Sequence, residues 1–171
     1  MYHEIERKFL IESMPNIEGV ESVPNEEHFL QHGDLVEERI QKRGDMYEYE
    51  IKTLFGSHEW NRDKRTISKE EFHVLKAKAP KSLLRDSYLL SQQKPRVSIK
   101  QYHGDYRELI FAQVEFDSHD EAESYEPLPW MGTEITNSHL GRDSQLLLLD
   151  REHFLEILRA EESKSAVADT Q

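Results

Sequence analysis

Eight segments of alternating apolar and polar side chains dominate this 171-residue chain. Alternation with a period of two places successive side chains on opposite faces of a strand, so these segments are predicted to be β-strands. They cover residues 4–11, 26–31, 36–43, 47–53, 62–67, 84–90, 97–102 and 109–117. Eight strands are enough to close a sheet into a barrel.

Two glycines indicate how neighbouring strands are connected. Gly44 and Gly104 each precede an aspartate and stand between two of the predicted strands. Glycine at the start of a two-residue loop suits the positive φ of a hairpin turn, so the neighbouring strands are expected to be antiparallel. The sequence therefore predicts an α+β fold, in which an eight-stranded antiparallel β-barrel is flanked by a few helices.

Helices are predicted at two places, with a shorter one possible at residues 120–124. One runs over residues 69–79, where Ser68 can cap the start and Pro80 ends the helix. A second begins near Asp150. Residues 161–171 contain no aromatic residue and no periodic apolar face, so we expect a single domain of residues 1–160 followed by a mobile tail.

The composition limits the metal chemistry and the partners. The chain has no cysteine, so a metal would take oxygen or imidazole ligands, which favours hard cations. A formal charge of -12 repels nucleic-acid phosphates, so we expect no nucleic-acid partner and a local basic pocket for any anionic ligand. No apolar run is long enough to cross a bilayer and the start shows no signal-peptide pattern, so we expect a cytoplasmic protein without membrane contact.

The first predicted strand carries its charges on one face. Glu4, Glu6 and Lys8 project from one side, while Ile5 and Phe9 occupy the other. Taken alone, this alternation also fits a solvent-exposed face of an edge strand. In a barrel, the charged set is expected to face the lumen together with Arg39 and Lys52 of other strands. The apolar residues of opposite phase, Ile40 and Ile51, are expected to pack outside the barrel with Ile5 and Phe9.

Several segments occur in an order typical of one family. Residues 4–10 resemble the Glu-x-Glu-x-Lys signature that opens CYTH (triphosphate tunnel metalloenzyme) proteins. Residues 39–45 resemble the Arg-x-Arg strand of that family and its following turn, and 112–116 resemble its Ala-Glu-x-Glu-Leu segment. The most specific match is 129–136, which resembles Pro-x-Trp-x-Gly-x-Glu-Val-Thr. The resemblance runs from Glu4 to about residue 146.

The resemblance implies a tunnel that holds a triphosphate and a divalent metal, Mg²⁺ or Mn²⁺. Cationic side chains pair with phosphate oxygens, and those expected to bind the substrate are Lys8, Arg39, Lys52, Arg62 and Arg85. A metal placed between carboxylates and phosphate removes their repulsion, and the expected ligands are Glu4, Glu6, Glu115 and Glu134. Catalytic roles are expected for Glu4, Glu6 and Lys8.

Five positions depart from the family pattern. Gln41 replaces the second arginine of Arg-x-Arg, Ser87 replaces one member of a basic pair, and Gln113 replaces the first glutamate of Glu-x-Glu. Lys64 and Lys100 reverse a charge, because they align with an acidic residue and with a metal-binding aspartate. Fewer carboxylates are expected to weaken the binding of a divalent ion.

The leading hypothesis is a metal-dependent triphosphatase that acts on inorganic tripolyphosphate or on an organic or nucleoside triphosphate. The five substitutions motivate an alternative, a non-catalytic CYTH module that binds phosphate or a nucleotide. A class IV-like adenylate cyclase is a second alternative, since that activity also occurs in the superfamily. The sequence leaves the organic group, the preferred metal and the oligomeric state open, and phosphate release with and without metal separates enzyme from binding module.

Overall fold

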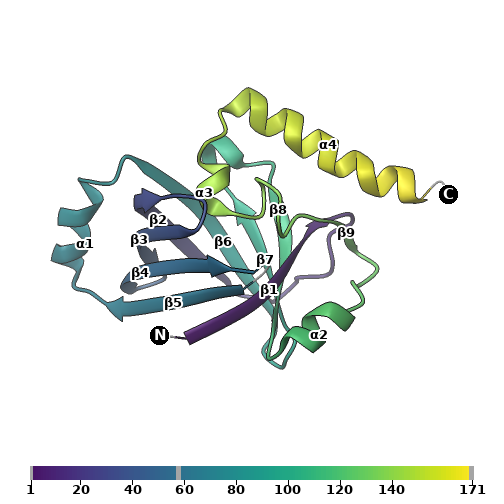
Figure 1. Cartoon of the computed structure of the whole chain (residues 1–171), viewed down its shortest axis with the longest axis horizontal. Helices are drawn as coiled ribbons and strands as arrows, with labels where there is room; N and C mark the ends of the chain where they lie inside the picture. The colour runs from purple at the N-terminus through teal and green to yellow at the C-terminus, as the bar shows by residue number, and fades with distance from the viewer. Residues whose placement is uncertain (1, 57–58, 170–171) are drawn as a thin grey trace.

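The protein is an antiparallel β-barrel, described by a computed structural model over residues 2–56 and 59–169 (Figure 1). The strands follow the order β5-β4-β3-β2-β6-β7-β8-β1, and β5 pairs with β1 to close the barrel. A short strand, β9, pairs with the end of β1 at Phe9 and Ile11, beyond the residues of β1 that pair with β5. The strands are β1 (Tyr2–Ile11), β2 (Ser22–His32), β3 (Val36–Arg43), β4 (Met46–Phe55), β5 (Glu59–Thr66), β6 (Lys81–Ser91), β7 (Arg96–Tyr102), β8 (Ile110–Phe116) and β9 (Met131–Glu134).

The predicted α+β fold with an eight-stranded antiparallel barrel is thus confirmed, and each predicted strand overlaps one of β1 to β8. The helical elements are α1 (Lys69–Lys76), the 3-10 turn η1 (Gly104–Tyr106), α2 (His119–Ser124), α3 (Asp143–Leu146) and α4 (Arg151–Asp169). Ser68 caps α1 as predicted, since its hydroxyl accepts a hydrogen bond from the backbone N–H of Glu71 at 3.0 Å. In the described part of the chain, none of the helices has the length and apolar character needed to cross a membrane.

Helix α4 extends beyond the point at which a mobile tail was expected. It continues past Glu161 to Asp169, and the hydroxyl of Thr133 on β9 donates to the backbone oxygen of Glu161 at 2.8 Å. The same hydroxyl lies 2.6 Å from that of Ser165. These polar contacts hold a stretch that lacks an apolar face, which is why apolar periodicity did not indicate helix there. The division at residue 160 stays a prediction, and residues 170–171 lie outside the described residues.

Outward-facing apolar side chains pack against two of the helices. Ile5 and Phe9 of β1 join a buried cluster with Ala122 of α2. Ile40 of β3 packs with Phe72 of α1 in another. These contacts fix the phase of β1 and β3, so the alternate residues of both strands point into the barrel.

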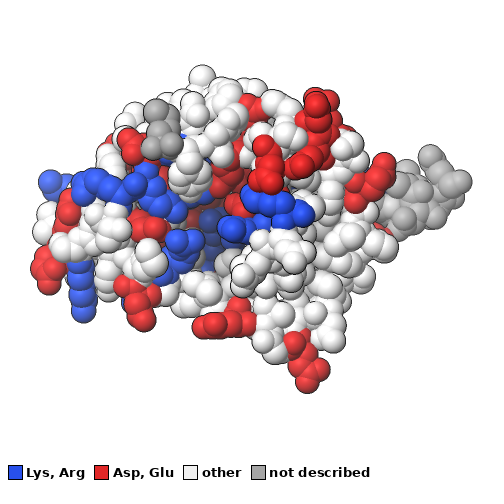
Figure 2. Space-filling view, turned by 90° about the horizontal axis from the view of Figure 1, so that it is seen from below, with Lys and Arg blue, Asp and Glu red and all other residues white. Residues whose placement is uncertain are grey.

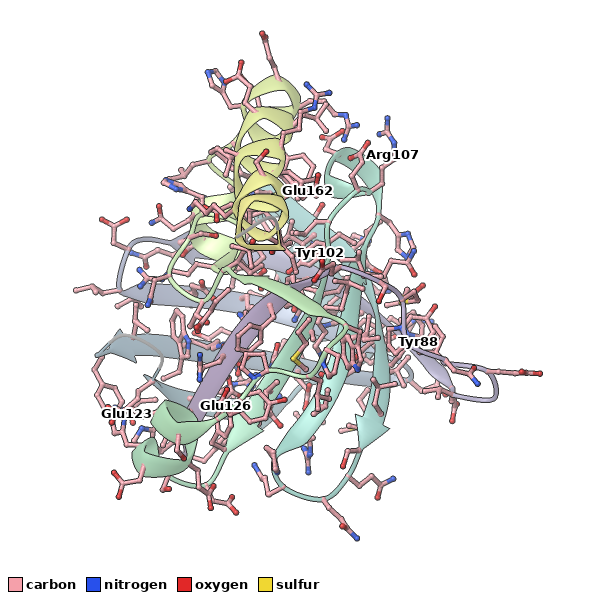
Figure 3. All side chains as sticks on the ribbon, turned by 90° about the vertical axis from the view of Figure 1, so that its right-hand side faces the viewer. Tyr88, Tyr102, Arg107, Glu123, Glu126 and Glu162 are labelled. Carbon is pink, nitrogen blue, oxygen red and sulfur yellow. The ribbon has the colours of Figure 1, made fainter. Side chains whose placement is uncertain are left out.

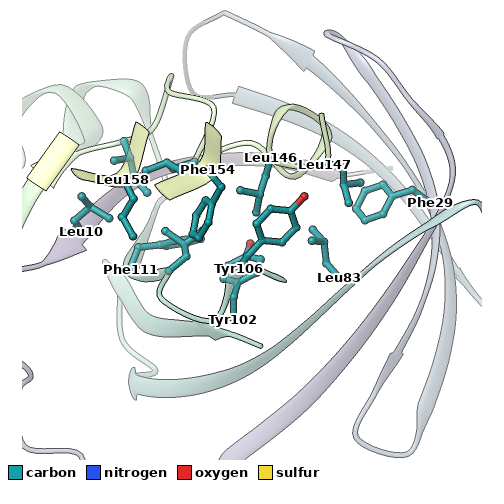
Figure 4. Packing of buried hydrophobic residues seen from close by; sticks show 13 residues of the cluster. Leu10, Phe29, Leu83, Tyr102, Tyr106, Phe111, Leu146, Leu147, Phe154 and Leu158 are labelled. Carbon is teal, nitrogen blue, oxygen red and sulfur yellow. The ribbon is translucent and has the colours of Figure 1, made fainter. Parts of the chain in front are cut away.

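The inward-facing side chains change from polar to apolar toward one end of the barrel. On β1, Glu4, Glu6 and Lys8 are followed in the same phase by Leu10, and other strands reach Phe29, Leu83, Tyr102 and Phe111 at the same end. These residues form one buried cluster with residues around α3 and on α4, which include Leu140, Leu146, Phe154 and Leu158 (Figure 4). The cluster fills this end, so the barrel is a cup with an apolar floor.

Candidate functional site

The polar part of the barrel interior is a cavity of about 360 Å³. Its described lining includes ten lysines and arginines but four carboxylates: Lys8, Arg39, Arg43, Lys52, Arg62, Lys64, Arg85, Lys94, Arg96 and Lys100, with Glu4, Glu6, Glu115 and Asp143. We call it the charged cavity. Figure 2 shows lysine and arginine side chains gathered around a hollow in the molecule. This local excess of positive charge, in a chain with a net charge of -12, is what a strongly anionic ligand requires.

All five cations predicted to bind phosphate lie in this lining, and so do the predicted ligands Glu4, Glu6 and Glu115. The three glutamates come from two neighbouring strands, because Glu6 of β1 stands directly opposite Glu115 of β8 in the antiparallel register. One ligand atom of each lies within 4.8 Å of the others. Within residues 2–56 and 59–165, whose side chains the structure describes, this is the one such cluster of histidine and acidic side chains. Three converging carboxylates are a suitable oxygen set for a divalent cation.

Neighbouring cations affect the two β1 glutamates differently. Burial alone would raise the pKa of Glu4, but the positive charges of Lys52 and Arg62 hold that pKa well below its ordinary value. Burial raises the pKa of Glu6, and Lys8, whose Nζ lies 3.2 Å from Oε1 of Glu6, offsets this only in part. That oxygen is buried and accepts no hydrogen bond of good geometry from the described residues. Glu6 therefore has ligand capacity that the protein does not use.

Glu134, the fourth predicted metal ligand, does not lie with the other three. It is exposed and pairs with the guanidinium of Arg7 through hydrogen bonds of 2.7 and 3.0 Å. Its strand β9 places Glu134 opposite Phe9, which belongs to the outward-facing set of β1. The strand phase thus explains why this carboxylate is outside the barrel, and we no longer expect it to bind the metal.

The two arginines nearest the floor are already bound by carboxylates of the chain. Arg39 contacts Glu50 at 2.9 Å and Asp143 at 3.2 Å, and both arginines contact Glu27, which is fully buried. Arg85 also donates to the hydroxyl of Tyr102 at 2.9 Å. Although burial works in the opposite direction, the surrounding carboxylates, with Glu27 the largest contributor, raise the pKa of Arg39 well above its ordinary value. This network already neutralises much of the positive charge at the floor.

Three cations of the cavity, which lie farther from the floor than Arg39 and Arg85, make looser contacts. Arg43 and Lys64 each lie 3.6 Å from Glu48, and Arg96 lies 3.6 Å from Glu115. These distances exceed ordinary hydrogen-bond lengths. The positive charge on this side of the cavity is therefore more available to a ligand than that of Arg39 and Arg85.

The chain resembles several solved structures, although no family model and no curated protein sequence matches it. Two structures of the protein NE1496, one called hypothetical and the other an inorganic triphosphatase, each give a TM-score of 0.63 at 25% identity. The matches cover 86% and 87% of this chain and 99% and 97% of the NE1496 chains. The chain is a divergent member of the CYTH, or triphosphate tunnel metalloenzyme, superfamily. A candidate adenylate cyclase from Bacillus halodurans shares the fold, with a TM-score of 0.56, 15% identity, and coverage of 72% of this chain and 86% of that one.

In this CYTH chain the substituted positions lie in the interior. Lys64, Lys100, Gln41 and Gln113 all line the charged cavity. The ammonium of Lys100 donates to the hydroxyl of Ser87 at 2.8 Å. Burial, followed by the positive charge of Arg85, lowers the pKa of Lys100 to about 7. Lys100 is thus a cation of the cavity whose charge depends on pH near neutrality.

Several buried residues of the CYTH cup were missed as site residues. Asn25 and Glu27 share the inward phase of Phe29. Glu27 lies within the predicted second strand, where its phase could have revealed it, whereas Asn25 required an earlier start of that strand. Asp143 contacts Arg39 across 104 residues of sequence, and no local pattern signals it. Tyr102, which donates to Asp143 at 2.7 Å, lies inside the barrel, whereas Glu123 and Glu126 project from the surface near α2 (Figure 3).

Proposed function

We propose that this CYTH protein hydrolyses a triphosphate, inorganic or organic, with a divalent metal held by Glu4, Glu6 and Glu115. The observation that carries the proposal is the convergence of these carboxylates inside a cavity lined by ten lysines and arginines. A polyanion and a cluster of carboxylates repel each other unless a cation lies between them. Because this cavity contains both the carboxylate cluster and the lysines and arginines suited to a polyanion, a bound metal would let the two groups act on one ligand. The similarity to the inorganic triphosphatase NE1496 supports the same activity.

The residues fit a hard divalent cation. All three ligands are carboxylates, Glu4 is kept ionised by Lys52 and Arg62, and an oxygen of Glu6 has unused acceptor capacity. When bound, such a cation would offset the charge of phosphate oxygens and polarise the phosphoryl group. Mg²⁺ and Mn²⁺ both suit an all-oxygen site, and the assay below compares them.

The cations of the cavity would position the phosphate chain and stabilise the charge that develops in the reaction. Water attacks a terminal phosphorus, the P–O bond of the anhydride breaks, and the leaving phosphate chain keeps the electron pair. Lys52 of β4 and Arg62 of β5 are cross-strand neighbours in the cavity wall, and Lys100 lines the cavity from β7, so this pair and Lys100 can contact different phosphate groups of one ligand. Enclosure within the barrel strengthens these interactions by limiting access of water.

Orthophosphate release from tripolyphosphate, measured with Mg²⁺, with Mn²⁺ and with excess chelator, tests the proposal. We expect metal-dependent release by the wild type and a loss of at least about tenfold in Glu115→Gln, which removes one ligand charge. Glu134→Gln is the matched control, because it makes the same change at the carboxylate outside the barrel. Release that does not require metal, or equal losses in both variants, would contradict the assignment.

The binding-module alternative is favoured by a different observation. Gln113 and Lys100 put an amide and an ammonium group in the cavity wall where additional carboxylates would strengthen a metal site. Binding of tripolyphosphate without turnover at any metal concentration would establish that alternative.

A further inference from the structure

A buried carboxylate on the outer side of the barrel wall has an environment unlike that of the carboxylates inside. Glu59 begins β5 and stands opposite Ile5 of β1, so it shares the outward phase of Ile5. Only 4% of its surface is exposed. Among the described residues, no lysine or arginine forms an ion pair with it, and its partners are two histidines, His3 and His119. A carboxylate buried to this extent requires compensation of its charge.

Each histidine contacts a different oxygen of Glu59. Nε2 of His3 lies 3.1 Å from Oε2, and Nε2 of His119 lies against Oε1. Oε1 is buried and accepts no hydrogen bond of good geometry from the described residues. It is therefore an acceptor with unused capacity that faces an imidazole nitrogen. We call His3, Glu59 and His119 the outer group.

Strand pairing places His3 beside Glu59. In the antiparallel register His3 stands opposite Asn61, two residues along β5 from Glu59, so the two side chains are diagonal neighbours on one face. The imidazole of His3 also packs against the ring of Phe55, with 4.8 Å between the ring centroids. The strand pairing and this ring contact together position the imidazole.

Helix α2 brings His119 to the same place. His119 is the first residue of the helix, and the hydroxyl of Ser118 caps the helix by accepting a hydrogen bond from a backbone N–H of the first turn at 3.2 Å. Ala122, on the same helix, is buried in one cluster with Ile5 of β1, which holds the helix on the barrel wall. Strands β1 and β5 and helix α2 thus converge on Glu59 from separate parts of the chain.

Two imidazoles and one carboxylate are a ligand set that zinc uses in proteins, whereas Mg²⁺ prefers oxygen ligands alone. Two ligand atoms at about 2.0–2.1 Å from a tetrahedral zinc ion are about 3.3 Å apart. The 3.1 Å between Nε2 of His3 and Oε2 of Glu59 is close to that separation. The outer group is more open than the inner cluster of three glutamates, because its histidines contact different oxygens. Their side chains are 45% and 52% exposed, so both can turn toward one ion and water can reach it.

We propose that His3, Glu59 and His119 bind a zinc ion on the outer face of the barrel, with water as the fourth ligand. The ion would compensate the charge of Glu59 and join β1, β5 and α2. The pairing of β1 with β5 covers only Tyr2–Ile5 of β1, and it is this pairing that closes the barrel. A zinc ion at the outer group therefore stabilises the seam of the barrel. The proposal is independent of the triphosphatase proposal, since none of its ligands belongs to the inner glutamate cluster.

Calorimetric titration of the full chain with Zn²⁺ tests the proposal, with excess Mg²⁺ present to compete for the all-carboxylate site inside. We expect the wild type to bind zinc, and His119→Asn and Glu59→Gln each to lose at least about tenfold in affinity. His153→Asn is the matched control, because it changes another exposed histidine that pairs with a carboxylate, and it should bind zinc as the wild type does. Zinc should also raise the melting temperature of the wild type and of this control, but not that of His119→Asn.

A variant of the inner cluster separates the two metal sites. Glu115→Gln removes an inner ligand and should keep the zinc affinity of the outer group. A zinc affinity that is lost in Glu115→Gln and unchanged in His119→Asn would assign the ion to the inner cluster and overturn the proposal. Absence of zinc binding by the wild type would overturn it as well. Because the side chain of His119 is exposed, His119→Asn should melt close to the wild type without zinc, so its loss of binding reports on the ligand and not on folding.

Discussion

The carboxylate of Asp143 lies 3.2 Å from the guanidinium of Arg39, at the floor of the cup. Asp143 comes from α3, outside the barrel wall, and it also contacts Arg85 at 3.4 Å. The surrounding arginines and lysine keep its pKa below the ordinary value although burial acts in the opposite direction, so it is ionised at neutral pH. A carboxylate of the chain thus occupies arginines that a phosphate would otherwise contact.

Replacing that carboxylate is expected to strengthen anion binding. Asp143→Asn keeps the shape of the side chain and removes one negative charge from a cavity that receives a polyanion, so affinity for tripolyphosphate should rise by about threefold or more. Asp63→Asn removes the same charge from an exposed position on β5 and should leave affinity unchanged. Weaker binding by a folded Asp143→Asn protein would show that Asp143 supports the ligand instead of competing with it.

The arginine network should matter more for stability than surface pairs do. Arg39→Met leaves the buried Glu27 and Glu50 without one of their cations, which typically costs about 3–5 kcal/mol of unfolding free energy. Arg65→Met breaks the exposed pair with Glu71, and the loss of such a solvent-screened pair should lower the unfolding free energy much less. Urea denaturation of the two variants measures the difference. Similar midpoints would mean that the buried network does not stabilise the fold.

Lys100 should make polyanion binding depend on pH. Its pKa is lowered to about 7 by burial and by Arg85, so it is charged below pH 7 and neutral above. Affinity for tripolyphosphate should therefore fall as pH rises through 7, and Lys100→Met should lose this component. Stability should change in the opposite direction: between pH 7 and the ordinary lysine pKa of 10.5, the unfolded chain binds a proton that the folded chain has released, so stability rises with pH. The protonation of tripolyphosphate itself changes with pH in the same way for the wild type and for Lys100→Met, so it does not affect the comparison. Parallel plots of affinity against pH for the two proteins would contradict this role of Lys100.

Adding a carboxylate should strengthen the metal site. Gln113 lies two residues before Glu115 on the inward face of β8, and Gln113→Glu adds an acidic group to the three that form the metal cluster. Together with Lys100→Asp, it also removes a positive charge that competes with the metal. We expect half-maximal activation at a lower Mn²⁺ concentration in the double variant, measured at fixed tripolyphosphate. An unchanged metal requirement would indicate that these two positions do not face the metal.

The strands and most interior residues could be predicted because alternation is a local property. Glu4, Glu6 and Lys8 share a phase on one strand, and Arg39 and Lys52 follow the same rule on theirs, so closing the barrel brings all five together. The closed floor could not be predicted, since Leu10 and Phe29 meet Leu146 and Phe154 only through the path of the C-terminal segment. Glu134 was expected among the metal ligands because of a motif match, and such a match carries no information on which face of a strand points into the barrel.

A crystallographic measurement tests the central claim most directly. Crystals grown with Mn²⁺ and tripolyphosphate, measured where manganese scatters anomalously, should show the metal between Glu4, Glu6 and Glu115 and the anion in contact with Lys52 and Arg62. Manganese at Glu134, or an anion bound only on the outer surface of the barrel, would contradict the account.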